Sequence, residues 1–277
     1  MQPGEELPLP EFFRTSDGVR LAFTVDDFTD PWRRSRPLLL LHAAMGSSRR
    51  WYAMVPPLAR RYRVIRMDLR GHGASEVPEA ELPLTMSRLV QDVRELLQHL
   101  YIANVDIVGN SAGGYIAQNL AIEWPELVRS LVLFGSTPGL RESQAGTWIP
   151  RIAKEGLREF LAATISDRFP SSHDPRHVAW FLDEAAKNDT TWIGRFVGLM
   201  ASLWWMDELR RIRCPTLLVV PGAETVGHAE TYEKMHTRIP DADLITYPGL
   251  PHNICDIAPE RCAVDILAFL HRRFPED

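Results

Sequence analysis

The chain has 277 residues, of which 45% are hydrophobic and 24% charged, as expected for a globular protein with one sizeable core. Its net charge of −5, without a basic block, argues against a nucleic-acid-binding protein. Three irregularly spaced cysteines suggest no disulfide framework, and no apolar stretch approaches a membrane span. Residues 1–10 lack the pattern of a signal peptide. We therefore expect a cytoplasmic protein that acts on a small molecule; the sequence leaves open whether it forms a homodimer.

Short apolar runs alternate with helix-like segments through the first half of the chain. The turn signal Ser16-Asp17-Gly18 predicts a β-hairpin, and residues 31–37 read as a polar, arginine-rich link. Thr85 starts a helix with an apolar stripe at helical spacing, formed by Met86, Leu89, Val93, Leu96, Leu97 and Leu100. The strands expected here are residues 12–15, 21–25, 38–41, 63–67, 105–108 and 131–134, and the other helices are residues 51–60 and 115–124.

This alternation stops between residues 137 and 212, where only helix-like segments occur, at 157–165, 177–187 and 193–205. It resumes with strands at 216–220 and 244–247 and helices at 229–239 and 259–273. Strands that alternate with helices predict an α/β fold, with a mostly parallel central sheet flanked by helices. Residues 1–136 and 213–277 would form this core, and residues 137–212 an inserted helical cap.

The segment from Val105 to Trp124 organises the rest of the chain. An apolar strand leads into Gly109-Asn110-Ser111-Ala112-Gly113-Gly114, and a helical run follows. This is the pattern of a nucleophile elbow, in which a sharp turn exposes a serine in front of a helix N-terminus. Gly109 and Gly113 leave room where neighbouring side chains would collide. We therefore predict that Ser111 is a catalytic nucleophile.

A serine hydroxyl needs a base, and an acid must fix the tautomer of that base. His252 lies in the loop after the last predicted strand, where the base is expected. Glu224, in the turn after the strand at 216–220, is the predicted acid, with Asp256 as the alternative. His42 and His72 are interpreted as structural. His173 and His177 are four residues apart but lack the other ligands of a metal motif, so no metal is expected.

Two backbone N–H groups would hold the oxyanion of the tetrahedral intermediate. We assign them to Ala112, directly after the nucleophile, and to Ala44 in the small-residue loop after the strand at 38–41. Met45 and Trp51 would lie near the pocket mouth. Five of the eight tryptophans lie in the predicted cap and either form its own core or line an apolar pocket: Trp148, Trp180, Trp192, Trp204 and Trp205. Trp204 and Trp205 are the pair that we predict to bind substrate.

Together these motifs resemble the α/β-hydrolase superfamily over essentially the whole chain. The stretch Asp68-Leu-Arg-Gly-His-Gly-Ala-Ser75 and the layout of the cap are similar to 3-oxoadipate enol-lactonases. The Gly-Asn-Ser-x-Gly-Gly elbow equally resembles meta-cleavage-product C–C hydrolases. Ala43 stands where family members usually carry Gly, and Glu224 where Asp is usual. The resemblance to C–C hydrolases implies a cap arginine for a substrate carboxylate, with three candidates: Arg168, Arg176 and Arg195.

The sequence thus predicts a serine hydrolase, without a cofactor, that cleaves an ester or lactone of a small, partly apolar molecule through an acyl-enzyme. The first alternative keeps the triad but cleaves a C–C bond, as in meta-cleavage-product hydrolases. The second is a cofactor-free dioxygenase or lyase on the same scaffold, in which His252 deprotonates the substrate and Ser111 only donates a hydrogen bond to it.

Overall fold

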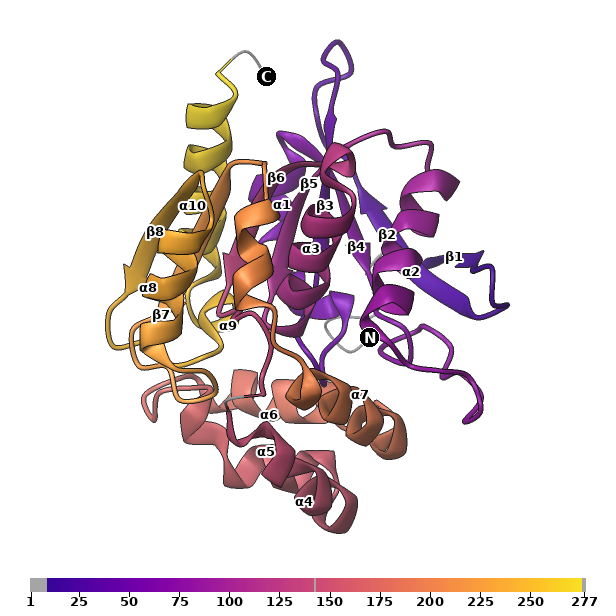
Figure 1. Cartoon of the computed structure of the whole chain (residues 1–277), viewed down its shortest axis with the longest axis vertical. Helices are drawn as coiled ribbons and strands as arrows, with labels where there is room; N and C mark the ends of the chain where they lie inside the picture. Colours follow the sequence, from indigo (N-terminus) through magenta and orange to yellow (C-terminus); the bar gives the residue numbers. More distant parts are fainter. Residues whose placement is uncertain (1–8, 142, 276–277) are drawn as a thin grey trace.

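A single eight-stranded sheet runs through the molecule, with helices on both of its faces (Figure 1). The computed structural model describes residues 9–141 and 143–275. The prediction that residues 1–10 are not a signal peptide therefore lies almost wholly outside the described residues. The strand order is β1-β2-β4-β3-β5-β6-β7-β8. β2 pairs antiparallel with β1 and β4, and every pairing from β4 to β8 is parallel. The predicted fold class is confirmed.

The strands lie close to their predicted positions. Their bounds are β1 (Glu11–Arg14), β2 (Arg20–Asp26), β3 (Arg36–Leu41), β4 (Tyr62–Met67), β5 (Val105–Asn110), β6 (Val128–Phe134), β7 (Thr216–Pro221) and β8 (Ala242–Tyr247). The α-helices are α1 (Val55–Ala59), α2 (Met86–His99), α3 (Ala112–Glu123), α4 (Trp148–Glu155), α5 (Leu157–Ala163), α6 (Pro175–Ala185), α7 (Thr190–Ser202), α8 (Ala229–Arg238), α9 (Ile254–Ile257) and α10 (Pro259–Arg273).

Two apolar clusters lie on opposite faces of the sheet, and the four leucines of β3 show how one strand serves both. Leu39 and Leu41 belong to the cluster beneath α2, α3 and α8, whereas Leu38 and Leu40 belong to the cluster beneath α1 and α10. Side chains alternate between the faces of a strand, so a strand buried on both sides needs a continuous apolar run. This explains the unbroken apolar run at residues 38–41 in the sequence.

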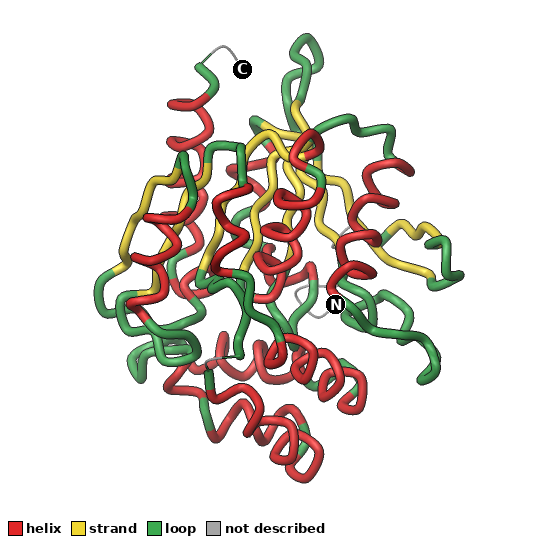
Figure 2. Tube along the Cα trace, in the orientation of Figure 1, coloured by secondary structure: helices red, strands yellow, loops and turns green. Residues whose placement is uncertain are grey.

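Between β6 and β7 the described residues form helices and turns alone (Figure 2). Helices α4 to α7 lie across the carboxyl ends of the strands, at the bottom of Figure 1. The sequence did not indicate α4. The helix expected at 193–205 ends at Ser202, because Leu203 is extended and its carbonyl accepts a hydrogen bond from Arg141 N–H at 3.2 Å. Trp204 and Trp205 therefore lie beyond the helix on which they were expected.

The helix expected at residues 51–60 is also shorter than predicted. A 3₁₀ turn, Ser48–Trp51, precedes a five-residue helix that starts at Val55. Pro56 and Pro57 occupy its first turn, where a missing N–H costs nothing, so they favour a new helix start over the continuation of an earlier one.

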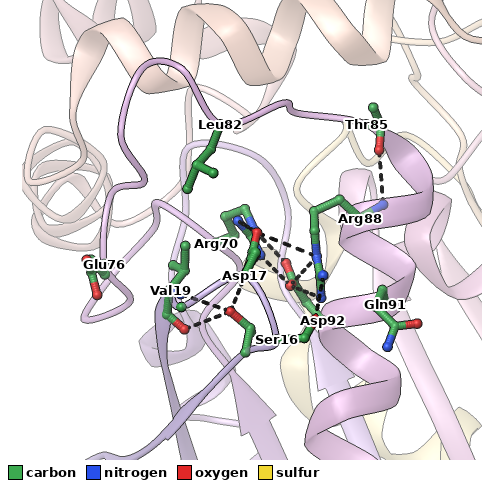
Figure 3. Close-up of polar contacts among 12 residues, drawn as sticks. Ser16, Asp17, Val19, Arg70, Glu76, Leu82, Thr85, Arg88, Gln91 and Asp92 are labelled. Carbon is green, nitrogen blue, oxygen red and sulfur yellow. Dashed lines mark hydrogen bonds and ion pairs between the residues drawn. The ribbon is translucent and has the colours of Figure 1, made fainter.

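A buried ion network fixes the loop that follows β4 (Figure 3). The Arg70 guanidinium donates to both carboxylate oxygens of Asp92, at 2.8 and 2.7 Å, and to those of Asp17, at 2.8 and 3.0 Å. The Thr85 hydroxyl accepts the Arg88 N–H at 3.1 Å and so caps α2, which carries Asp92. The indole N–H of Trp192, on α7, donates to the Arg70 carbonyl at 2.9 Å. The same loop therefore joins the hairpin, α2 and the helical insertion.

Among the described residues, no helix is both long enough and apolar enough to cross a membrane. The three cysteines are buried and form no disulfide.

Candidate active site

Loops at the carboxyl ends of four parallel strands bring the predicted catalytic residues together. Ser111 follows β5, Glu224 follows β7, His252 follows β8, and Ala44 follows β3. The carboxyl edge of a parallel sheet is where α/β folds place their ligands. Helices α4 to α7 cover this edge (Figure 1).

Ser111 has a strained backbone, with φ 49° and ψ −115°. Few residues other than glycine adopt positive φ, so the surroundings must hold the turn in place. The Ser111 N–H donates to the Phe134 carbonyl at 2.8 Å, and the Ser136 hydroxyl donates to the Ser111 carbonyl at 2.8 Å. The neighbouring glycines are required sterically: a Cβ on Gly109 would lie 2.4 Å from the Gly114 Cα, and one on Gly113 2.1 Å from the Leu41 carbonyl oxygen.

His252 is bound by Glu224. Its Nδ1 lies 2.9 Å from Oε2 and 3.1 Å from Oε1 of that carboxylate, so the other ring nitrogen, Nε2, is left to face a nucleophile. Ser111 and His252 both line one cavity. Asp256, the alternative acid, instead forms a bidentate ion pair with Arg50 that includes a 3.0 Å bond from Nε. The geometry therefore favours Glu224 as the partner of His252.

Three further donors hold the Glu224 carboxylate. The backbone N–H groups of Val226 and Gly227 donate to Oε1 at 2.8 and 3.2 Å, and the Tyr232 hydroxyl donates to Oε2 at 2.9 Å. Burial by itself raises the pKa of Glu224, but the interaction with His252 and these backbone donors outweigh it and lower the pKa to about 2. Glu224 is thus a carboxylate at neutral pH.

Ala44 and Ala112 line the same cavity as Ser111. Ala112 is the first residue of α3, so its N–H has no acceptor within the helix. His42 stabilises the loop before Ala44: its Nδ1 lies 2.8 Å from the Ala43 carbonyl, and its Nε2 accepts the Leu69 N–H at 3.0 Å. Burial lowers the pKa of His42 to about 4, so the ring is neutral. The structural roles expected for His42 and His72 agree with these contacts, since His72 Nδ1 lies 3.0 Å from the Arg70 carbonyl.

The structure places the predicted pocket residues in different surroundings. Met45 lines the cavity, but Trp51, Trp204 and Trp205 do not. Trp51 is buried in the apolar cluster beneath α1 and α10. Trp205 lies behind the cavity wall: its ring contacts that of Tyr115 edge-on at 5.6 Å, and its indole N–H donates to Gln118 at 3.0 Å.

The cavity has a volume of about 50 Å³ and contains residues that the motifs did not reveal. Besides the sequence candidates Trp148 and Arg168, its further lining consists of Ala43, Arg50, Tyr115, Leu140, Leu161, Phe181, Val197, Met200, Val226 and Asn253. Half of these come from the helical insertion, where a mixed apolar pattern cannot show which side chains face inward. Of the other insertion tryptophans named above, Trp148 is the one that reaches the cavity.

Arg168 is the one arginine among the three candidates in the insertion that reaches this cavity. Its side chain is 7% exposed, and it donates to the carbonyl and hydroxyl of Thr164 at 3.0 and 2.9 Å. Burial lowers its pKa to about 10, so it stays protonated at neutral pH. Arg176 is exposed and paired with Asp174, and Arg195 donates to the Leu82 carbonyl. Arg168 thus brings a buried positive charge to the cavity that Ser111 lines.

Asn253, next to His252 in the chain, also faces the cavity, and its buried amide nitrogen has no hydrogen-bond partner within the described residues. A buried donor without a partner is costly unless a bound molecule satisfies it. Within the same described residues, no group of three or more His, Cys, Asp and Glu side chains could hold a metal ion. His173 and His177 instead contact each other, with ring nitrogens 2.9 Å apart.

Comparisons with known proteins identify the family. Residues 36–259 match the family model described as the alpha/beta hydrolase fold, so the chain belongs to the α/β-hydrolase family. It is 29% identical over 251 residues to a 2-hydroxy-6-oxo-6-(2'-aminophenyl)hexa-2,4-dienoic acid hydrolase of Metapseudomonas resinovorans, covering 87% of this chain and 86% of that relative.

Two solved structures are similar over almost their whole lengths. A hydrolase from Pseudomonas aeruginosa PA01 is 30% identical with a TM-score of 0.84, covering 94% of this chain and 98% of that one. The enol-lactonase from Burkholderia xenovorans LB400 has a TM-score of 0.85 at 21% identity, covering 94% and 99%, which shows a shared fold. The resemblance to the superfamily is confirmed.

Proposed function

We propose that the protein is a serine hydrolase, independent of cofactors, that cleaves an ester or lactone in a small, partly apolar molecule carrying a carboxylate. The observation that carries this proposal is that His252, held by Glu224, lines one cavity with Ser111 and the buried Arg168. A buried arginine that forms no ion pair with a described carboxylate, in the cavity that holds the nucleophile, favours an anionic substrate.

In this reaction, Ser111 Oγ attacks the substrate carbonyl while His252 Nε2 takes its proton. Glu224 keeps the Nδ1 proton in place and stabilises the imidazolium that forms. The N–H groups of Ala44 and Ala112 hold the oxyanion. His252 then returns the proton to the leaving alkoxide. Finally, water deprotonated by His252 hydrolyses the acyl-enzyme and restores Ser111.

The size of the cavity implies that its lining moves when substrate enters. A volume of about 50 Å³ is far below the roughly 300 Å³ at which small-molecule pockets begin. A substrate of several heavy atoms must therefore displace side chains such as Trp148 and Phe181, which come from the helical insertion.

C–C bond hydrolysis is the second candidate, and three observations favour it. The elbow carries Asn110 before Ser111, and Arg168 supplies the cap arginine that a substrate carboxylate would need. The relative from Metapseudomonas resinovorans is named for the hydrolysis of a hexadienoic acid.

The proposal is tested by measuring turnover of carboxylate-bearing lactones, the matched neutral esters and a vinylogous diketone acid, with Ser111→Ala in parallel. Serine-dependent turnover of lactones or esters supports the first candidate. Serine-dependent turnover of the diketone acid alone supports the second. Turnover that persists in Ser111→Ala would contradict both and favour serine-independent chemistry.

A further inference from the structure

A second, larger cavity lies at the end of the sheet opposite Ser111. It has a volume of about 570 Å³, within the range of roughly 300–1,000 Å³ that is typical of small-molecule sites. The loop between β2 and β3, the end of α1, the start of β4 and the last turns of α10 form it. Figure 1 shows these segments at the top of the molecule, far from helices α4 to α7. We call this cavity the distal groove.

The distal groove is strongly basic although the chain carries a net charge of −5. Its arginines are Arg33, Arg34, Arg36, Arg60 and Arg61. Arg60 is paired with Asp30 at 3.0 Å. Arg33, Arg34 and Arg61 line the same groove but have no side-chain hydrogen bond or ion pair with any described residue. Three arginines that line one groove without an ion pair to a described residue repel one another, so an anion in the groove would relieve this repulsion.

The side of the groove formed by α10 is mainly apolar. Its residues are Val264, Leu267, Ala268, His271 and Phe274, the last of which follows the end of the helix. Val264 is 61% exposed, which leaves apolar surface uncovered beside the arginines. On the loop between β2 and β3, Phe28 and Trp32 are also exposed, at 59% and 81%. Guanidinium groups that face an apolar wall match a ligand with an anionic head and an apolar body.

The number of arginines that have no partner among the described residues indicates the chemistry of the ligand's anionic head. Each presents a planar fork of N–H donors that fits phosphate or carboxylate oxygens. A carboxylate carries one charge and two oxygens, whereas a phosphate monoester carries close to two charges and three terminal oxygens. Three guanidinium groups without a partner among the described residues, those of Arg33, Arg34 and Arg61, therefore suit the phosphate better.

We propose that the distal groove binds a single organic phosphate, with the phosphate among Arg33, Arg34 and Arg61 and an aromatic or acyl body against the α10 wall. The site is separate from the cavity around Ser111 and does not depend on the chemistry proposed there. A single dissolved molecule is the occupant because the arginines line a concave groove, which a flat bilayer surface would not fill.

The test is calorimetric titration of the whole protein with 1-naphthyl phosphate at low ionic strength. We expect saturable binding of one molecule per chain, and much weaker binding of inorganic phosphate, which has no apolar body. The triple variant Arg33→Gln/Arg34→Gln/Arg61→Gln should bind 1-naphthyl phosphate at least about tenfold more weakly, the effect of losing one to two charge-assisted contacts. Circular dichroism of the variant checks that it is folded.

Two further variants locate the probe. Arg176→Gln removes an exposed arginine of α6 and should leave binding unchanged. Arg168→Gln alters the cavity at Ser111 and should also leave it unchanged. Loss of binding in Arg168→Gln, equal binding by the triple variant and the unaltered protein, or no saturable binding would each overturn the proposal. Equal affinity for inorganic phosphate, or binding of phosphatidylglycerol vesicles without binding of 1-naphthyl phosphate, would overturn it too.

Discussion

The backbone N–H of His252 donates to the carbonyl of Asp167 at 3.1 Å. Asp167 belongs to the helical insertion, and its carboxylate also accepts the hydroxyl of Thr225, the residue after Glu224, at 3.2 Å. One residue of the insertion thus contacts both loops that carry the proposed base and acid. A movement of the insertion that admits substrate would therefore be transmitted to His252 and Glu224.

Thr225→Val should disturb this link. The variant loses one hydrogen bond on a partly exposed loop, so we expect kcat to fall by up to about tenfold with little change in stability. Steady-state kinetics with the best substrate of the panel measures this effect. Thr237→Val, which removes a local hydrogen bond on α8, serves as the control and should leave kcat unchanged. Unaltered kcat in Thr225→Val would show that the link does not position the catalytic loops.

Glu224→Gln should reduce kcat by about two to four orders of magnitude, because an amide cannot stabilise the imidazolium and permits the wrong tautomer. Glu230→Gln, at the exposed start of α8, is the matched control. Asp256→Asn should instead lower stability, by about 3–5 kcal/mol, since it leaves the buried Arg50 without its partner. Full activity in Glu224→Gln together with loss in folded Asp256→Asn would reverse the assignment of the acid.

Arg168→Gln should discriminate between substrates. We expect KM for a carboxylate-bearing substrate to rise at least about tenfold, with a change below about twofold for the matched neutral ester. Arg176→Gln, exposed at the start of α6, should change neither value. A similar rise in KM for both substrates would mean that Arg168 supports the cavity without recognising a carboxylate.

The free energy of unfolding should depend on pH through His72. Burial lowers the pKa of His72 from 6.5 to about 3. Between pH 6.5 and about pH 3, the unfolded chain therefore binds a proton at His72 that the folded chain excludes. The stability that the neutral ring contributes is complete above pH 6.5 and is lost as pH falls toward 3. His42 contributes in the same direction down to about pH 4.

Denaturant unfolding of His72→Gln measures this contribution. The variant should show a slope of stability against pH that is shallower by up to about 1.4 kcal/mol per pH unit between pH 6 and 4. The wild-type advantage over the variant should therefore shrink as pH falls. Parallel stability curves for the two proteins would contradict a buried neutral His72.

The sequence was most informative where the chemistry restricts the choice of residue. Ser111 follows from glycines that the turn requires, and Glu224 and His252 from the order of loops after the strands. The apolar runs of β3 and β7 similarly follow from burial on both faces. Pocket residues were harder to predict. Trp148 faces the cavity and Trp205 does not, and this difference depends on how α4 and the segment after α7 pack. Arg168 could be named as a candidate but not chosen over Arg176 and Arg195.

The most direct test of the account is covalent trapping of the nucleophile. A fluorophosphonate should add one phosphonyl group to the protein, and peptide mass spectrometry should locate it on Ser111. Ser111→Ala should not be labelled and should lose at least about three orders of magnitude in kcat. His252→Ala should be labelled far more slowly. Label on another residue, or substrate turnover by Ser111→Ala at the wild-type rate, would contradict serine catalysis at this site.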